Sequence, residues 1–327
     1  MIGSDPRADF FVVKNDTLEA RPTQDGVRIS RIDGTKPVDV GWVFRGSRVL
    51  AVRATSSARH EVVLFATLCD GIYTADEDQE SCTGGKRTVV ARGTSPGSLR
   101  EGGGVQSQDG VPRNELLASN PLAISGGVSA VWVTDQDSGE GAVVAVTEED
   151  RRTVLSSWSR QLAEVCSTSD STYRLSKELR SDLQRYSGFT LSEITMAGEL
   201  GMTLPAIAPE VYDLNLLCTP GGMGILLQVP GGATLMFMDS MGWSPDTINF
   251  SMPVRVLLDG SKGVAVLAQM STKNPSALEY VAIGRTGSKV SLKVPPDAEV
   301  RAVFEHPDGE LIAITQQDGV VEVSHVD

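Results

Sequence analysis

A glycine-containing turn followed by a short apolar run recurs along this chain, and the near-constant spacing constrains the fold more than any other feature. The glycines that mark the six turns are Gly46, Gly84, Gly126, Gly221, Gly260 and Gly309. Successive glycines lie 38, 42, 95, 39 and 49 residues apart. A spacing of about 40 residues is typical of a unit of four short strands. The pattern therefore predicts repeated antiparallel sheets, with one long interval that holds something else.

The runs after the turns have the composition of strands. They read VLAV, TVVA, SAVWV, ILLQV, VAVLA and LIAI, and most are bounded by Gly, Asp, Pro or Ser. Helical spacing is almost absent outside one region. The 33 glycines suit the many tight turns that short strands require. The fold class predicted from these features is all-β.

The last repeat resembles a known family. His306–Ile314 reads His-Pro-Asp-Gly-Glu-Leu-Ile-Ala-Ile and is similar to the turn of WD40-like and TolB-like β-propeller repeats, with looser versions at Trp243–Asp246 and Leu258–Lys262. The resemblance implies a β-propeller, which we predict to have six or seven blades in a single domain over residues 1–327. We expect Phe10–Val13 or Val27–Ile32 to complete the blade begun near the C-terminus.

Residues 147–201, inside the long interval, predict a helical insertion. Thr147 stands three residues before Asp150 in an N-cap pattern, and Thr190–Glu193 has the form of a capping box. Between them, Leu175, Leu179 and Leu183 recur every four residues, as along one side of a helix. Short helices need a surface to pack on. They either cover the β body or offer apolar side chains to a partner, for which the candidates are Trp158, Leu175, Leu179 and Leu183.

Charge and composition exclude several functions. The formal net charge of −13 argues against nucleic-acid binding, because a phosphate backbone would be repelled. No apolar stretch approaches the length that spans a membrane. The sequence has no Walker A or dinucleotide-binding pattern, and we expect no cofactor. The expected partners are other protein subunits.

The four cysteines, Cys69, Cys82, Cys166 and Cys218, form no CxxC pair and no zinc-ligand spacing. Cys69 and Cys82 are close enough to close a disulfide loop, but we favour buried free thiols in a reducing compartment. The first residues show no signal-peptide pattern. A cytoplasmic or other intracellular location is therefore expected, and the alternative is an extracytoplasmic protein whose leader has been removed.

Two motifs fall short of a chemical site. Gly93–Gly97 matches the GxSxG pattern of serine hydrolases, but Pro96 has no N–H to donate to an oxyanion, so a turn is the better interpretation. Asp135, Asp137 and Glu140 resemble the start of a calcium loop, but the bidentate Glu at the twelfth position is missing. An acidic hairpin turn is favoured there, and no metal site is expected.

These observations favour a non-enzymatic protein-interaction scaffold, a subunit of a larger assembly. The alternative is a hydrolase or lyase whose carboxylates gather in the central channel of the propeller. Asp70, Asp135 and Asp239 are the candidates for that chemistry, since each follows a strand-like run.

Overall fold

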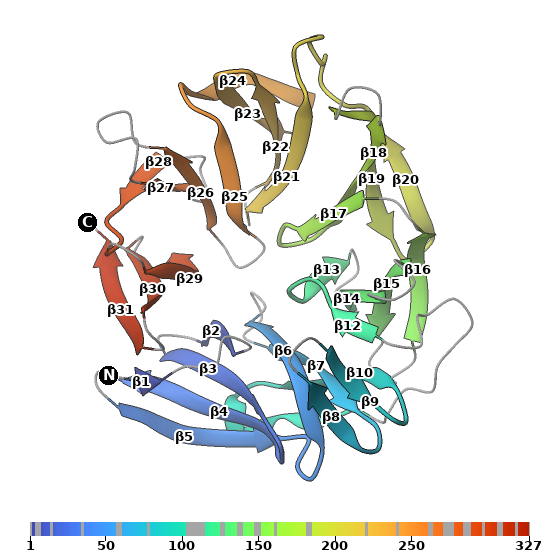
Figure 1. Cartoon of the computed structure of the whole chain (residues 1–327), viewed down its shortest axis with the longest axis vertical. Coiled ribbons are helices and arrows are strands. Elements are labelled where there is room, and N and C mark those ends of the chain that lie inside the picture. The colour runs from blue at the N-terminus through green and yellow to red at the C-terminus, as the bar shows by residue number, and fades with distance from the viewer. Residues whose placement is uncertain are drawn as a thin grey trace. The chain divides into compact units, whose positions relative to one another are not determined.

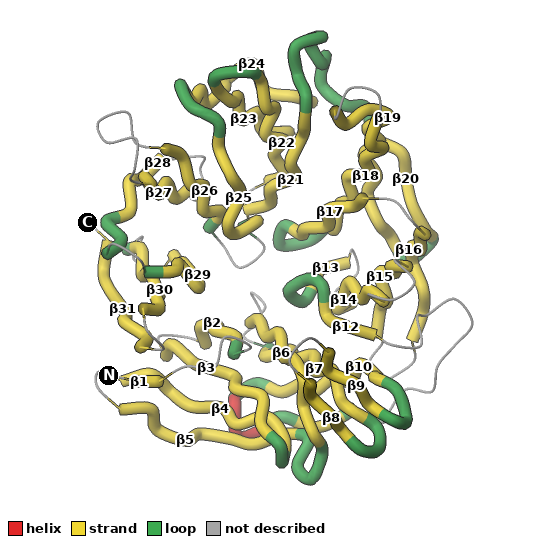
Figure 2. The backbone as a smooth tube through the Cα atoms, viewed as in Figure 1, coloured by secondary structure: helices red, strands yellow, loops and turns green. Residues whose placement is uncertain are grey.

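The computed structural model describes most of the chain as strands (Figures 1 and 2). The described residues are 2–3, 8–13, 16–33, 36–56, 61–76, 79–102, 115–124, 128–135, 140–146, 152–159, 162–180, 185–219, 222–239, 242–260, 264–270, 278–283, 289–295, 298–305, 310–317 and 320–326. Within these ranges the only helical element is a 3₁₀ turn at Pro96–Ser98. None of the described helical segments has the length and apolar character needed to cross a membrane.

The described chain falls into two compact units. The first comprises Met1–Arg160 with Gln316–Glu322, and the second comprises Gln161–Thr315 with Val323–Asp327. Each unit is built from antiparallel sheets in which most strands pair with the next strand in sequence; β7 pairs with β10 and β12 with β14.

Three complete sheets belong to the first unit. The first contains β2 (Asp9–Val13), β3 (Asp16–Thr23), β4 (Gly26–Asp33) and β5 (Lys36–Val43). The second contains β6 (Arg48–Ser56), β7 (Val62–Cys69), β10 (Lys86–Gly93) and β11 (Arg100–Glu101), with a separate hairpin of β8 (Tyr73–Asp76) and β9 (Gln79–Cys82). The third contains β12 (Glu115–Leu117), β13 (Leu122–Ile124), β14 (Val128–Asp135), β15 (Glu140–Val146) and β16 (Arg152–Ser159).

Three complete sheets also belong to the second unit. They are formed by β17 (Leu162–Ser167), β18 (Thr172–Arg180), β19 (Arg185–Thr195) and β20 (Gly198–Met202); by β21 (Asp213–Thr219), β22 (Gly222–Val229), β23 (Gly232–Asp239) and β24 (Gly242–Phe250); and by β25 (Val254–Asp259), β26 (Ala265–Met270), β27 (Leu278–Ile283) and β28 (Lys289–Leu292). A seventh sheet has the order β1 (Ile2–Gly3), β31 (Val320–Val326), β30 (Leu311–Gln317) and β29 (Glu299–Glu305). The seven sheets are the blades of a β-propeller.

Strand β7 explains why the sheets stack face to face. All eight of its side chains are buried, and successive side chains point to opposite faces of a strand. Leu64 and Ala66 pack in a core cluster with Leu18 of the first sheet. Phe65, on the other face, packs with Val131 of the third sheet. A strand that is apolar on both faces is therefore buried between two neighbouring sheets.

The predicted helical insertion at 147–201 is wrong. The described residues of this range form strands β16 to β20, which complete the third sheet and make up the fourth. A spacing of four residues, as in Leu175 and Leu179, satisfies the two-residue period of a strand as well as the helical period. Thr172 and Tyr173, just before Leu175, and Phe189 and Thr190 in β19 are residue types that favour strands.

The glycine spacing indicated the correct fold, although the marked glycines do not all stand at the same place in a sheet. In the sequence, Gly126, Gly221, Gly260 and Gly309 come before β14, β22, β26 and β30, each of which lies next to the end strand of its sheet. Gly46 and Gly84, by contrast, precede β6 and β10, which lie in the same sheet. The interval of 95 residues contains a whole sheet that has no glycine turn of this kind.

The terminal strands pair differently from the prediction. Phe10–Val13 and Val27–Ile32 lie in β2 and β4 of the first sheet. The strand that pairs with β31 is β1, with Ile2 opposite Val321 and Gly3 opposite Val320. Two residues are too few to give a recognisable strand pattern, so the sequence pointed to longer strands nearby.

Candidate functional site

The β8–β9 hairpin is the only described pair of strands that lies outside the seven sheets. It is inserted in the sequence between the end of β7 and the start of β10, two paired strands of the second sheet. A disulfide joins Cys69, the last residue of β7, to Cys82, the last residue of β9. The guanidinium of Arg48 lies over the ring of Tyr73, 4.3 Å from its centroid. The base of the hairpin is thus attached both covalently and through packing.

Backbone hydrogen bonds fix the same base. The Gly84 N–H donates to the Asp70 carbonyl at 2.6 Å, and the Thr83 N–H donates to the Ile72 carbonyl at 3.1 Å. The Ile72 N–H donates in turn to the Thr83 hydroxyl at 2.8 Å. A Cβ at Gly84 would lie 2.5 Å from the Asp70 carbonyl oxygen, so only glycine allows this close approach. Ile72 is held in this frame with 69% of its surface exposed.

Of the three carboxylates predicted for an enzyme, the structure describes the side chain of Asp70 alone. Asp70 accepts hydrogen bonds from Arg87 Nε at 2.9 and 2.8 Å, and this ion pair holds it at the base of the hairpin. The backbones of Asp135 and Asp239 end β14 and β23, and their side chains are outside the described part. Among the described residues, no three histidine, cysteine or acidic side chains are grouped as metal ligands would be.

The other two motifs are turns in the described chain. In the GxSxG segment, Pro96–Ser98 forms the 3₁₀ turn, and Ser95 Oγ donates to Ser98 Oγ at 3.0 Å, which confirms the turn interpretation. At the calcium-like segment, Asp135 and Glu140 face each other across β14 and β15, as the ends of a hairpin do. Asp137 lies outside the described residues.

A buried charged cluster in the second unit joins two sheets. Lys177, on β18, is only 6% exposed. Its ammonium group lies 2.6 Å from Glu164 Oε1 on β17 and 2.9 Å from Asp213 Oδ1 on β21. The one buried cation therefore lies within ion-pair distance of two carboxylates, and burial of a charge requires such a partner.

Polar side chains extend this cluster toward a third sheet. Asn215 Nδ2 donates to Glu164 Oε1 at 3.0 Å, and the Leu216 N–H donates to Glu164 Oε2 at 2.6 Å. Gln228 Nε2 donates to Asn215 Oδ1 at 3.1 Å and to the Val254 carbonyl at 2.5 Å. Both oxygens of Glu164 are occupied, so this carboxylate is positioned as a structural acceptor and not as a general base.

The cluster holds one cation against two carboxylates, and this imbalance explains its pKa values. Burial raises the pKa of Asp213, and the nearby Glu164 charge raises it further, although Lys177 opposes both effects. Burial alone would lower the pKa of Lys177, but the Glu164 carboxylate and the hydrogen bonds to both acids raise it above its usual value. Both shifts reduce the excess negative charge in a poorly solvated place.

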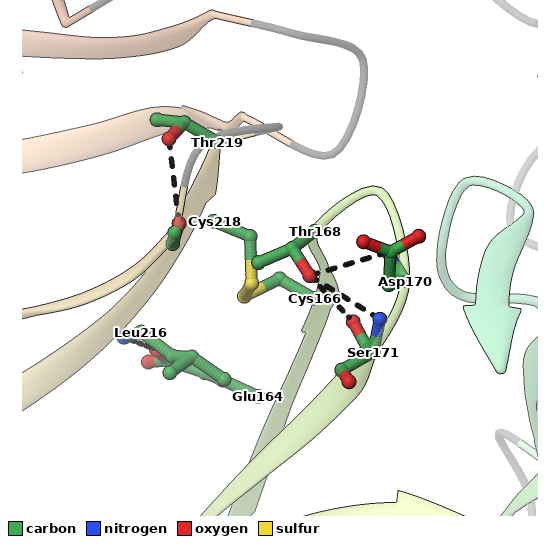
Figure 3. Close-up of a disulfide and its surroundings, with 9 residues drawn as sticks. Glu164, Cys166, Thr168, Asp170, Ser171, Leu216, Cys218 and Thr219 are labelled. Carbon is green, nitrogen blue, oxygen red and sulfur yellow. Dashed lines mark hydrogen bonds between the residues drawn. A yellow bond between two sulfur atoms is a disulfide. The ribbon is translucent and has the colours of Figure 1, made fainter. Parts of the chain in front are cut away.

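A second disulfide lies beside the charged cluster. Cys166 on β17 and Cys218 on β21 are both buried and bonded to each other, with Glu164 and Leu216 on the same two strands (Figure 3). The structure has no free cysteines, so the expectation of buried free thiols is wrong. The pairing was missed because the two cysteines are 52 residues apart in sequence and meet only when equivalent strands of successive sheets lie side by side.

The four predicted partner-binding residues differ in their burial, and two of them have side chains outside the described part of the chain. Leu175 is fully buried in a core cluster with Leu191 and Leu214, so it has no surface to offer a partner. Trp158, on β16, is half-buried, and its ring centroid lies 5.8 Å from that of Trp132. Leu179 lies on β18 with its side chain undescribed, and Leu183 is outside the described residues.

Comparisons with known proteins support the fold alone. No protein-family model matches the sequence, and no curated protein sequence is significantly similar to it. Among solved structures, the BP39L lectin from Burkholderia pseudomallei is 15% identical, with a TM-score of 0.53 over 100% of this chain and 96% of the lectin. YCF48 bound to D1 peptide is 13% identical, with a TM-score of 0.50 over 100% of this chain and 94% of that chain. The Dos1 propeller covers 99% of this chain and 82% of its own at 10% identity, with a TM-score of 0.47.

Proposed function

We propose that the protein is a non-enzymatic interaction scaffold, a subunit of a larger assembly, and that the β8–β9 hairpin is one of its contact elements. The observation behind the proposal is the rigid presentation of Ile72, the most exposed of the large apolar side chains in the described chain. An exposed apolar side chain on an immobilised frame loses little conformational entropy when a partner covers it. A hairpin that served only stability would not need to project such a group.

The hydrolase or lyase alternative has less support. Of its three candidate acids, Asp70 is engaged by Arg87. Glu164 and Asp213, the acids that do come together, share the Lys177 ammonium group and accept further hydrogen bonds from backbone N–H groups. An active site needs at least one group that is free to meet a substrate. We therefore keep the scaffold as the single proposal.

We also propose that the protein resides in an oxidising compartment. Two disulfides and no free cysteine are typical of extracytoplasmic proteins, since cytosolic thiols are kept reduced. This favours the extracytoplasmic alternative over the intracellular one. Thiol labelling of the protein taken from its native source, with and without prior reduction, tests this point. Labelling without reduction would contradict it.

The scaffold is tested by affinity purification from the native source, with identification of the co-purifying chains. We expect one or more chains to be recovered with the wild type and lost with Ile72→Asp. Leu278→Asp is the matched control, because Leu278 is 55% exposed on another sheet, and it should retain those chains. Recovery of a single species without partners, or equal recovery with both variants, would contradict the proposal.

A further inference from the structure

The disulfide at the base of the β8–β9 hairpin differs from the inter-sheet disulfide in its accessibility. Cys82 is partly exposed, and Thr83, the next residue, is exposed. Cys69, the partner of Cys82, is only 7% exposed. Cys166 and Cys218 are 1% and 0% exposed and lie in an apolar core cluster. A thiol in solution can therefore reach the sulfur of Cys82, whereas the sulfurs of the inter-sheet disulfide are covered.

Cationic residues flank Cys69 on both sides. Arg48 stands directly opposite Cys69 in the register of β6 and β7, and Lys86 stands directly opposite it in the register of β7 and β10. Side chains that oppose each other in an antiparallel pair lie on the same face of the sheet, with Cβ atoms about 5 Å apart. Cys69 is therefore placed between two positively charged residues on one face of its sheet.

The guanidinium of Arg48 lies at the hairpin. It is stacked over the ring of Tyr73, and Tyr73 pairs with Cys82 across β8 and β9. Arg48 Nε is buried and has no hydrogen-bond partner among the described residues. A buried polar group in this state gains from an acceptor nearby, and an anion suits a cationic group best. A thiolate on Cys69 would be such an anion, and neighbouring cations favour the thiolate over the thiol.

The cross-strand neighbours of the inter-sheet disulfide carry no positive charge. Tyr173 stands opposite Cys166, and Met223 stands opposite Cys218. Both cysteines lie on end strands of their sheets, so each has one such neighbour. Lys177 of the same sheet is already paired with two carboxylates. The apolar surroundings of this disulfide therefore disfavour the thiolates that its reduction would release.

We propose that Cys69–Cys82 is a thiol–disulfide exchange site for a small thiol or a dithiol. The thiolate of the reagent attacks Cys82 Sγ, a new S–S bond forms there, and the bond between the two cysteines breaks. Its electron pair passes to Cys69 Sγ, which leaves as a thiolate between Arg48 and Lys86. A leaving thiolate that cations stabilise departs faster, and access decides which sulfur is attacked.

A second thiolate completes the reduction. It attacks the reagent's sulfur in the mixed disulfide and displaces Cys82 as a thiolate, which takes up a proton from solvent. Two thiols are thereby oxidised to one disulfide, and the two cysteine sulfurs receive the two electrons. An oxidising compartment drives the reverse reaction, so the pair rests oxidised there. Exchange opens the base of the frame that holds Ile72, and this consequence rests on the proposed function, whereas the exchange itself does not.

Reduction of the folded full chain by dithiothreitol measures both disulfides in one sample. Free thiols are alkylated at successive times and located by mass spectrometry. We expect Cys69–Cys82 to be reduced at least about 100-fold faster than Cys166–Cys218. Equal rates, or faster reduction of the inter-sheet disulfide, would overturn the proposal. The comparison needs no variant, so it does not depend on whether a substituted chain folds.

Glutathione, a monothiol, identifies the sulfur that is attacked. Acid quenching after a brief exposure traps the mixed disulfide, and peptide mapping locates it. We expect glutathione on Cys82 and a free thiol on Cys69. Glutathione found mainly on Cys69 would contradict the assigned roles of the two sulfurs.

Charge substitutions isolate the contribution of the cations. Arg48→Gln and Lys86→Gln should each slow the reduction by dithiothreitol about fivefold, because the Cys69 thiolate loses a counter-charge. Arg48→Lys and Lys86→Arg keep the charge and should keep the wild-type rate. Arg53→Gln is the matched control, since Arg53 lies on β6 with Arg48 but stands opposite Phe65. Unchanged rates in both Gln variants, or an equal loss in the control, would overturn the proposal. All three experiments use this chain alone, so their outcome is independent of whether the scaffold finds partners.

Discussion

The two disulfides differ in what they join: one closes a hairpin, and the other links two sheets. Cys69–Cys82 closes a loop of 13 residues at the base of a hairpin that lies outside the sheets. Cys166–Cys218 spans 52 residues and joins β17 to β21, the first strands of successive sheets, beside a buried ion cluster. The first fixes the shape of a surface element, whereas the second holds two sheets together. The same covalent bond thus closes a hairpin outside the sheets in one unit and cross-links two sheets in the other.

Removal of the inter-sheet disulfide should have the largest effect on stability. Cross-linking residues 52 apart lowers the entropy of the unfolded chain by an amount equivalent to about 4 kcal/mol in the chain-entropy model. Cys166→Ala with Cys218→Ala should lower the free energy of unfolding by about this amount. Urea denaturation of the oxidised proteins measures the change. An unchanged midpoint would show that the ion cluster alone is sufficient to hold the two sheets.

Removal of Lys177, the cation of the charged cluster, should have the second-largest effect on stability. Lys177→Met leaves Glu164 and Asp213 without their shared partner in a poorly solvated place, and breaking such a pair costs about 3 kcal/mol. Glu164 is partly exposed, so we expect the lower end of the usual range. Lys293→Met, at an exposed lysine, is the matched control and should leave the denaturation midpoint where it is. Equal midpoints for Lys177→Met and the control would mean that the cluster contributes nothing to stability.

Opening the hairpin disulfide should destabilise the protein less and act mainly on the hairpin itself. A loop of 13 residues corresponds to at most about 3 kcal/mol of chain entropy, and the hairpin can open without the sheets unfolding. Cys69→Ala with Cys82→Ala should therefore speed amide hydrogen exchange in β8 and β9 and leave exchange in β7 unchanged. Faster exchange throughout β7 would show that the hairpin supports its sheet, and the contrast between the two disulfides would then fail.

The local features of the fold could be predicted from the sequence, whereas contacts between successive sheets could not. Alternating apolar strands and glycine turns are local signals, and they predicted an all-β propeller. The fourth sheet was mistaken for helices because Leu175 and Leu179 fit two periods equally well. The Cys166–Cys218 disulfide and the Lys177–Asp213 ion pair join residues that lie in successive sheets. Such pairs become predictable only when the blade boundaries are known, and the helical interpretation had removed the boundary that relates them.

The smallest expected effect concerns the pH dependence of the cluster. Because burial raises the pKa of Asp213 above its ordinary value of 3.8, the folded protein takes up this proton more readily than the unfolded chain. The resulting contribution to stability is fully present below the pKa that Asp213 has in the unfolded chain. It is lost as the pH rises through the pKa that Asp213 has in the folded protein. The free energy of unfolding of the wild type, relative to Asp213→Asn, should therefore increase as the pH is lowered from neutral toward 4. The other carboxylates titrate in both proteins and largely cancel in this difference. A difference that decreases on acidification would mean that the attraction of Lys177 outweighs burial, and that the cluster stabilises the folded state through the ionised form of Asp213.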